Sequence, residues 1–164
     1  MIHEFLERRK VKKAFEKLVD PETVESLLRD GAQPQQLKQG RIEFVLAFVR
    51  GESPAPVSER IARVADLAVA HGAVVHDLVG ALVIIAFGTH PAASPESGGR
   101  ASLVQALREQ LVSDIKIVHG AADGHHGLLG GETRMSYTFL VPQFDHILGT
   151  LSRLQFGESE EFTR

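Results

Sequence analysis

Side chains that can bind metal ions gather in one glycine-rich segment of the chain. His119, Asp123, His125 and His126 lie within a short stretch that also contains several glycines. Imidazole and carboxylate groups are ligands for Zn²⁺ and Ni²⁺, so a metal centre is one hypothesis. The spacing matches no familiar ligand motif, and the competing interpretation is a solvated polar hairpin over residues 120–131.

Other chemistry is restricted by residue type. The 21 Asp and Glu residues leave acid–base or metal chemistry open, whereas the absence of cysteine removes thiol nucleophiles, disulfides and zinc–thiolate sites. A phosphate-binding loop requires a Gly-Lys-Ser/Thr sequence after its glycines, and none follows them here. Gly51-Glu-Ser lacks the strand–turn–helix context of a nucleophile elbow. Arg50 is able to contact a phosphate group, or to pair with a nearby carboxylate or solvent.

Length and charge narrow the class of protein. The chain has 164 residues, 43% of them apolar, which suits one domain with a sizeable core. A formal net charge of −3 argues against a strongly basic nucleic-acid-binding module. No apolar run reaches the roughly 18 residues of a membrane-spanning helix, and the charged N-terminus is unlike a secretory signal. With the lack of cysteine, these features predict a cytoplasmic protein.

Hydrophobic periodicity predicts a mixed order of helices and strands. A basic amphipathic helix is expected over 1–19, and a second helix begins at the Asp20-Pro21 cap and ends near Gly31. A polar tail is expected over 157–164. The pattern predicts an α+β fold, with helices on one face of a mostly antiparallel sheet. The remaining elements are strands over 41–50, 73–79, 81–87, 115–119 and 134–141, a hairpin at Gly80, and helices over 57–71, 103–112 and 144–154.

Short motifs follow one another along the chain: Phe15–Leu28, Phe44–Phe48, Ala70–Gly80, Phe87-Gly88, His119-Gly120, Gly127–Gly130 and Arg134–Thr138. Taken in this order, they resemble the catalytic domain of class III adenylate and guanylate cyclases, and the first resembles the lead-in to bacterial cyclase domains. The resemblance implies a ferredoxin-like-derived cyclase fold, with a lead-in helix over 1–19 and a cyclase-homology domain over 20–164. Class III cyclase domains generally act as head-to-tail dimers, so it also implies a homodimer or a heterodimer with a related domain.

The resemblance fails at the positions that carry the family's metal ions. Two aspartates hold two Mg²⁺ ions in such cyclases, and they would fall here at Arg50 and Ala81. Alanine offers no oxygen ligand. Arginine places a positive charge where a negative one is needed. At a separation of about 4 Å and a dielectric constant near 20, two unit charges interact by about 4 kcal/mol, so the change of sign disfavours a divalent ion strongly.

The implied nucleotide site is altered as well. The base-selecting lysine would fall at Asp77 and its partner at Thr138, a tolerable variant. The transition-state asparagine and arginine would fall at Asp145 and Gly149, and glycine offers no donor to a phosphate.

These substitutions predict a catalytically silent cyclase-like domain that acts as a dimerising regulatory or interaction module. It would need no cofactor or metal ion, would bind no nucleic acid and would have no direct membrane span. The alternatives are a divergent cyclase that makes cAMP or cGMP, and a metal-independent nucleotide-binding domain that uses Arg50.

Overall fold

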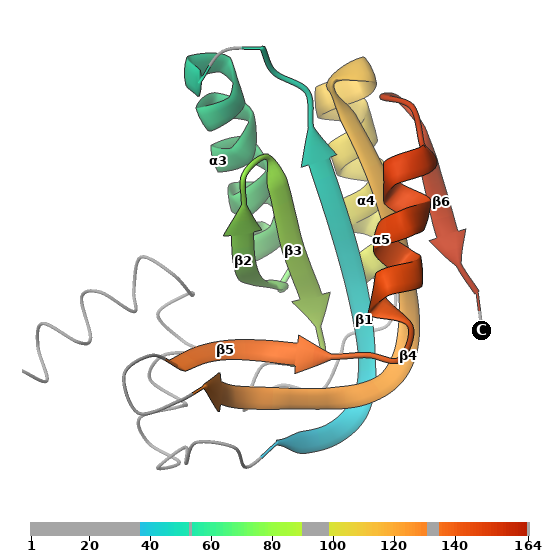
Figure 1. Cartoon of the computed structure of the whole chain (residues 1–164). Coiled ribbons are helices and arrows are strands. Elements are labelled where there is room, and N and C mark those ends of the chain that lie inside the picture. Colours follow the sequence, from blue (N-terminus) through green and yellow to red (C-terminus); the bar gives the residue numbers. More distant parts are fainter. Residues whose placement is uncertain (1–36, 53, 90–98, 131–134, 164) are drawn as a thin grey trace, which may run out of the picture.

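The computed structural model describes residues 37–52, 54–89, 99–130 and 135–163 (Figure 1). The lead-in helix predicted over 1–19, the helix predicted from Asp20 and the domain boundary between them lie outside these residues. None of the described helices is long and apolar enough to cross a membrane.

Six strands form one sheet, in the order β2-β3-β1-β4-β5, with β6 paired to β4. All pairs are antiparallel except β4 with β6, which is parallel. The α+β class and the mostly antiparallel sheet are therefore confirmed. The strands are β1 Lys38–Val49, β2 Val74–Val79, β3 Leu82–Phe87, β4 Ile115–Gly130, β5 Met135–Leu140 and β6 Ser159–Phe162.

β1 is the central strand because both of its faces are apolar. Val45, Ala47 and Val49 belong to one buried cluster, and Phe44 and Leu46 belong to another on the opposite face. Successive side chains of a strand point to opposite faces, so a strand that is apolar on both sides must be covered on both sides.

Helices cover both faces of the sheet, and the expectation of helices on one face is wrong. α3 (Pro54–Ala70) and α4 (Gly99–Leu111) pack on the first face, and a short 3₁₀ turn, η1 (Val112–Asp114), follows α4. α5 (Phe144–Arg153) places Ile147 and Leu151 on the opposite face. Figure 1 shows α5 in front of the sheet, with α4 behind it. The apolar stripe of a helix shows that it packs, but not on which face of the sheet.

β4 runs continuously from Ile115 to Gly130, so the predicted strand over 115–119 and the hairpin after it are corrected to one strand. Its glycines mark close contacts rather than turns. A Cβ atom on Gly120 would lie 2.6 Å from the carbonyl oxygen of Phe162, and one on Gly124 would lie 2.3 Å from that of Leu140. Figure 1 shows β4 bending strongly along this stretch.

Two further elements complete the sheet. The β2–β3 hairpin predicted at Gly80 is confirmed, and Gly80 has the positive φ (60°) that such a turn favours in glycine. The polar tail predicted over 157–164 contains β6 instead. Phe162 packs against Phe44, with ring centres 6.3 Å apart.

Candidate functional site

Arg50 and Ala81 lie side by side at one end of the sheet. Val49 ends β1, and its backbone N–H donates to the carbonyl oxygen of Ala81 in the β2–β3 turn (3.1 Å). Arg50 follows directly, and its N–H donates to the carbonyl oxygen of Asp114 (2.7 Å). The fold thus brings together the two positions that the resemblance assigns to metal-binding carboxylates.

Two cations surround one aromatic ring at this end of the sheet. The guanidinium carbon of Arg50 lies 4.7 Å from the centre of the Phe156 ring. Lys116, the cross-strand partner of Phe48, places its ammonium 5.5 Å from the same ring and 5.3 Å from that of Phe48. The Lys116 ammonium also donates to the carbonyl oxygen of Leu154 (3.3 Å). Neither cation forms an ion pair with a described carboxylate.

The nearby acid is already occupied. The Asp114 carboxylate lies 3.3 Å from a guanidinium nitrogen of Arg60, and Arg60 also donates to the carbonyl oxygen of Arg50. Within the described residues, no group of three or more His, Cys, Asp or Glu side chains is placed to hold a metal ion. Fixed positive charge repels a divalent cation and attracts an anion, so the chemistry suited to this place is anion binding.

Asp77 and Thr138 are next in sequence to two residues that touch. The Nδ1 atom of His76, in β2, lies 2.9 Å from the carbonyl oxygen of Tyr137, in β5. Asp77 is exposed, and its carboxylate accepts a hydrogen bond from the N–H of Leu78 (2.8 Å). The two positions that the resemblance assigns to base recognition thus lie beside the contact between His76 and Tyr137. Asp77 has a negative charge where the resemblance assigns a lysine.

A polar network beneath this pair ties the β2–β3 hairpin to the β4–β5 ribbon. The Nε2 atom of His76 lies 2.7 Å from the hydroxyl of Thr89, which is fully buried. The Tyr137 hydroxyl donates to the carbonyl oxygen of Thr89 and lies 3.4 Å from Nδ1 of His126. The His76 ring packs against those of Tyr137 and Phe139, each with a centre 5.1 Å away.

The hydrogen bonds of His76 place one proton on its Nδ1 atom. The carbonyl oxygen of Tyr137 can only accept, so Nδ1 donates to it, and the Thr89 hydroxyl is able to donate to Nε2. Both ring nitrogens are satisfied in the neutral form. Burial lowers the pKa of His76 from 6.5 to about 4, despite the opposing effect of the Tyr137 carbonyl. Burial also lowers the pKa of His126.

Asp145 is not brought to the Arg50–Ala81 pair. Asp145 is exposed in the first turn of α5, whereas Leu154, which contacts Lys116, follows the last turn. Nine residues of helix span about 14 Å, so Asp145 lies well away from the cation pair. Beside Gly149, the guanidinium of Arg153 folds back over the helix, 3.6 Å from where a Cβ atom would lie.

The His and Asp side chains of the glycine-rich segment are spread along β4. His119 lines a groove beside α4, and Asp123 is exposed, 3.7 Å from Arg41. His125 is exposed, whereas His126 is buried beside Tyr137. The four side chains therefore do not form the metal centre considered from the sequence.

Lys116, Phe156 and the His76 network were missed by sequence reasoning. Lys116 reaches Phe48 through cross-strand pairing, and Phe156 reaches Arg50 from far along the chain. Such partners depend on strand register, which no local pattern reveals. The lone tyrosine of the chain, in the strand that follows the histidine-rich segment, was the available signal for a buried polar contact.

Several solved structures of nucleotide cyclases have this fold. The adenylyl cyclase CyaB from P. aeruginosa is 17% identical with a TM-score of 0.64, over 77% of this chain and 78% of that one. A bacterial light-regulated adenylyl cyclase is 12% identical with a TM-score of 0.67, over 96% of this chain and 53% of that one. A non-canonical dimeric guanylyl cyclase domain from the fungus Blastocladiella emersonii is 10% identical with a TM-score of 0.60, over 76% and 80%. No protein-family model and no curated protein matches the sequence.

The chain therefore has the fold of class III adenylyl and guanylyl cyclase catalytic domains, as the motifs predicted. At 10–17% identity to these three structures, the likeness is one of fold.

Proposed function

We propose that this domain is catalytically silent and works as a regulatory interaction module. One observation carries the proposal: the place where a class III cyclase needs two carboxylates holds Arg50 beside Ala81. The guanidinium of Arg50 and the ammonium of Lys116 share the Phe156 ring there. Two Mg²⁺ ions would meet fixed positive charge without a carboxylate ligand, so the metal-dependent activation of a ribose hydroxyl is lost.

We propose further that the module dimerises, with itself or with a related cyclase-type domain, and that it does so in the cytoplasm. β2 is the edge strand of the sheet, and Leu78 and Val79 near its turn are 51% and 57% exposed. Exposed apolar side chains on an edge strand favour association. A guanylyl cyclase domain with this fold is dimeric. Sedimentation velocity over a concentration series tests the state, and a strictly monomeric chain at high concentration would contradict it.

Loss of the metal site is tested by binding of Mn²⁺, which broadens NMR signals of nearby nuclei. The wild-type chain is expected to show no saturable broadening at residues 49–51 and 80–82. The double variant Arg50→Asp/Ala81→Asp restores two carboxylates at positions that the fold already holds together, and it should gain saturable broadening there. Saturable Mn²⁺ binding by the wild-type chain at these residues would overturn the proposal.

A second function, metal-independent binding of a nucleotide, is supported by the unpaired cations at the end of the sheet. Arg50 and Lys116 have no carboxylate partner among the described residues and present two positive charges to a phosphate. ATP or GTP in EDTA should then raise the melting temperature, because a ligand of the native state stabilises it. Arg50→Gln and Lys116→Gln should remove the shift, and the exposed control Arg41→Gln should keep it. No shift at millimolar nucleotide would exclude this function.

A further inference from the structure

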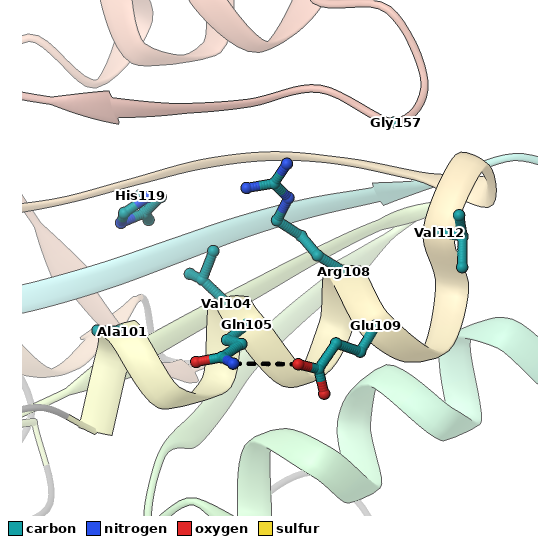
Figure 2. Close-up of a pocket in the computed structure, with 8 residues that line it drawn as sticks. All are labelled: Ala101, Val104, Gln105, Arg108, Glu109, Val112, His119 and Gly157. Atoms are coloured by element: carbon teal, nitrogen blue, oxygen red, sulfur yellow. Dashed lines mark hydrogen bonds between the residues drawn. The ribbon is translucent and has the colours of Figure 1, made fainter.

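A groove lies between α4 and β4, on the face of the sheet opposite α5, and the turn at Gly157 closes one side of it (Figure 2). Its volume is about 500 Å³, within the range of small-molecule sites. None of the positions that the cyclase resemblance assigns to metal or nucleotide lines it. Whatever binds there would occupy a separate site.

Arg108 brings an unpaired positive charge to the groove. Its side chain extends from α4 towards β4 and the Gly157 turn (Figure 2), and it forms no ion pair with a described carboxylate. The nearest acid on the same helix, Glu109, accepts a hydrogen bond from the Gln105 amide (3.0 Å). Gln105 and Glu109 also line the groove, and Figure 2 shows the two side chains together, apart from the Arg108 guanidinium.

The acids on the strand side are occupied by a different arginine. Arg100 lies 3.3 Å from the Glu43 carboxylate and 3.7 Å from that of Glu161. His119, also at the groove, has a buried Nδ1 atom without a hydrogen-bond partner. The groove therefore combines an unpaired guanidinium with an imidazole whose hydrogen bonding is incomplete.

Val112 adds two unfavourable features at the end of the groove. Its φ is +49°, a left-handed conformation that a β-branched residue rarely adopts. Its side chain is 64% exposed although it is apolar. Strained backbone and exposed apolar side chains concentrate at binding sites, where a ligand compensates for their cost.

We infer that this groove binds a small aliphatic monocarboxylate, whose carboxylate pairs with Arg108 and whose chain lies against Val104 and Val112. Guanidinium groups bind carboxylates through two parallel hydrogen bonds, and Ala101 extends the apolar wall. A monoanion fits better than a phosphate dianion because one unpaired cation is available and Glu161 is close by. The inference goes beyond the proposed function and does not depend on it.

The test is an NMR titration of the full ¹⁵N-labelled chain with hexanoate. Saturable shifts are expected at the amides of residues 104–112 and 119. Hexanol keeps the aliphatic chain without the charge, hexylammonium reverses the charge, and inorganic phosphate supplies a different anion. All three should bind at least about tenfold more weakly than hexanoate. Hexanol and hexylammonium lack the negative charge that pairs with Arg108, and inorganic phosphate lacks the aliphatic chain. Equal binding of any of them, or no saturable shift with hexanoate, would overturn the inference.

Variants assign the effect to the groove. Arg108→Gln should weaken hexanoate binding about tenfold, as loss of one charge-assisted contact does. Arg63→Gln, at an exposed arginine on α3 that contacts Gln110 (3.1 Å), is the matched control and should leave binding unchanged. Val112→Gly relieves the left-handed backbone and removes the apolar contact, so it should weaken binding about threefold while raising the melting temperature. Unchanged binding in Arg108→Gln would contradict the assignment.

Discussion

At the end of β1, one backbone hydrogen bond determines which side chains come together. The hydrogen bond from Val49 to Ala81 holds two positions together as a metal site would require. The side chains at the site are nevertheless an arginine and an alanine, with Lys116 close to the same aromatic ring. Motif spacing alone drew attention to Arg50 and Ala81, which lie together at this end of the sheet. Lys116 and Phe156 were not predicted, because their approach depends on strand register and on the path of the C-terminal segment.

At the residue scale, stability should depend on pH through His76. Its pKa is about 4 in the folded chain and 6.5 in an ordinary environment, so the unfolded chain binds the proton first as the pH falls. The free energy of unfolding should therefore drop by about 3 kcal/mol between pH 6.5 and pH 4. His126 and His119 add to the drop, since burial lowers the pKa of each. Urea unfolding at a series of pH values measures it.

The variant His76→Gln assigns this pH dependence to one residue. It removes the titrating ring and the contacts to Tyr137 and Thr89, so it should be less stable than wild type at pH 7. It should then lose less stability than wild type between pH 6.5 and pH 4. The exposed His125→Gln is the control and should follow the wild-type curve. Identical pH dependence in wild type and His76→Gln would contradict the account.

At the scale of elements, periodicity predicted the central strand, the hairpin and all three described helices. β1 was recognisable because its apolar run faces both ways, and Gly80 because a tight turn favours a positive φ. β4 was divided wrongly, because glycine was interpreted as a turn signal although Gly120 and Gly124 serve close packing. β6 was missed because Ser-Glu-Glu-Phe carries one apolar side chain. Its pairing with β4 stabilises it, and this is a tertiary contact without a local pattern.

Two glycines that face each other across β1 and β4 should respond in opposite ways to alanine. Gly40 pairs with Gly124, but a Cβ atom on Gly40 meets nothing within 4 Å, whereas one on Gly124 would lie 2.3 Å from the Leu140 carbonyl oxygen. Gly124→Ala should lower the free energy of unfolding by about 3 kcal/mol through overpacking. Gly40→Ala should raise it by about 0.5–1 kcal/mol, because alanine loses less chain entropy in a strand. Chemical denaturation measures both, and equal effects would contradict the close approach at Gly124.

At the scale of the whole molecule, the fold does not depend on the residues that the resemblance assigns to the cyclase site. Two apolar clusters maintain the order of the strands and the helices on both faces of the sheet. Of the positions that the resemblance assigns to the site, only Ala81 belongs to a cluster, and it packs at the margin of the first. Packing therefore stabilises the fold whether or not the site binds metal. A domain built in this way is expected to keep its fold when the residues of the site change.

The edge of the sheet should determine self-association. Leu78→Lys/Val79→Lys places two charges on exposed apolar positions of β2 and should weaken dimerisation at least about tenfold, as loss of a central apolar contact does. Val69→Lys is the matched control, since Val69 is also exposed (48%) but lies on α3. Sedimentation velocity measures the dissociation constant. Equal weakening by both changes would contradict a dimer interface at β2.

The most direct test of the central claim is an assay of cyclic nucleotide formation. The purified chain, at a concentration where sedimentation shows its assembled state, is incubated with ATP or GTP and with Mg²⁺ or Mn²⁺. The account predicts no cAMP or cGMP above the protein-free control, because Arg50 and Ala81 supply no ligand for either ion. Turnover by the wild-type chain that is abolished by changing Arg50 or Lys116 would contradict it.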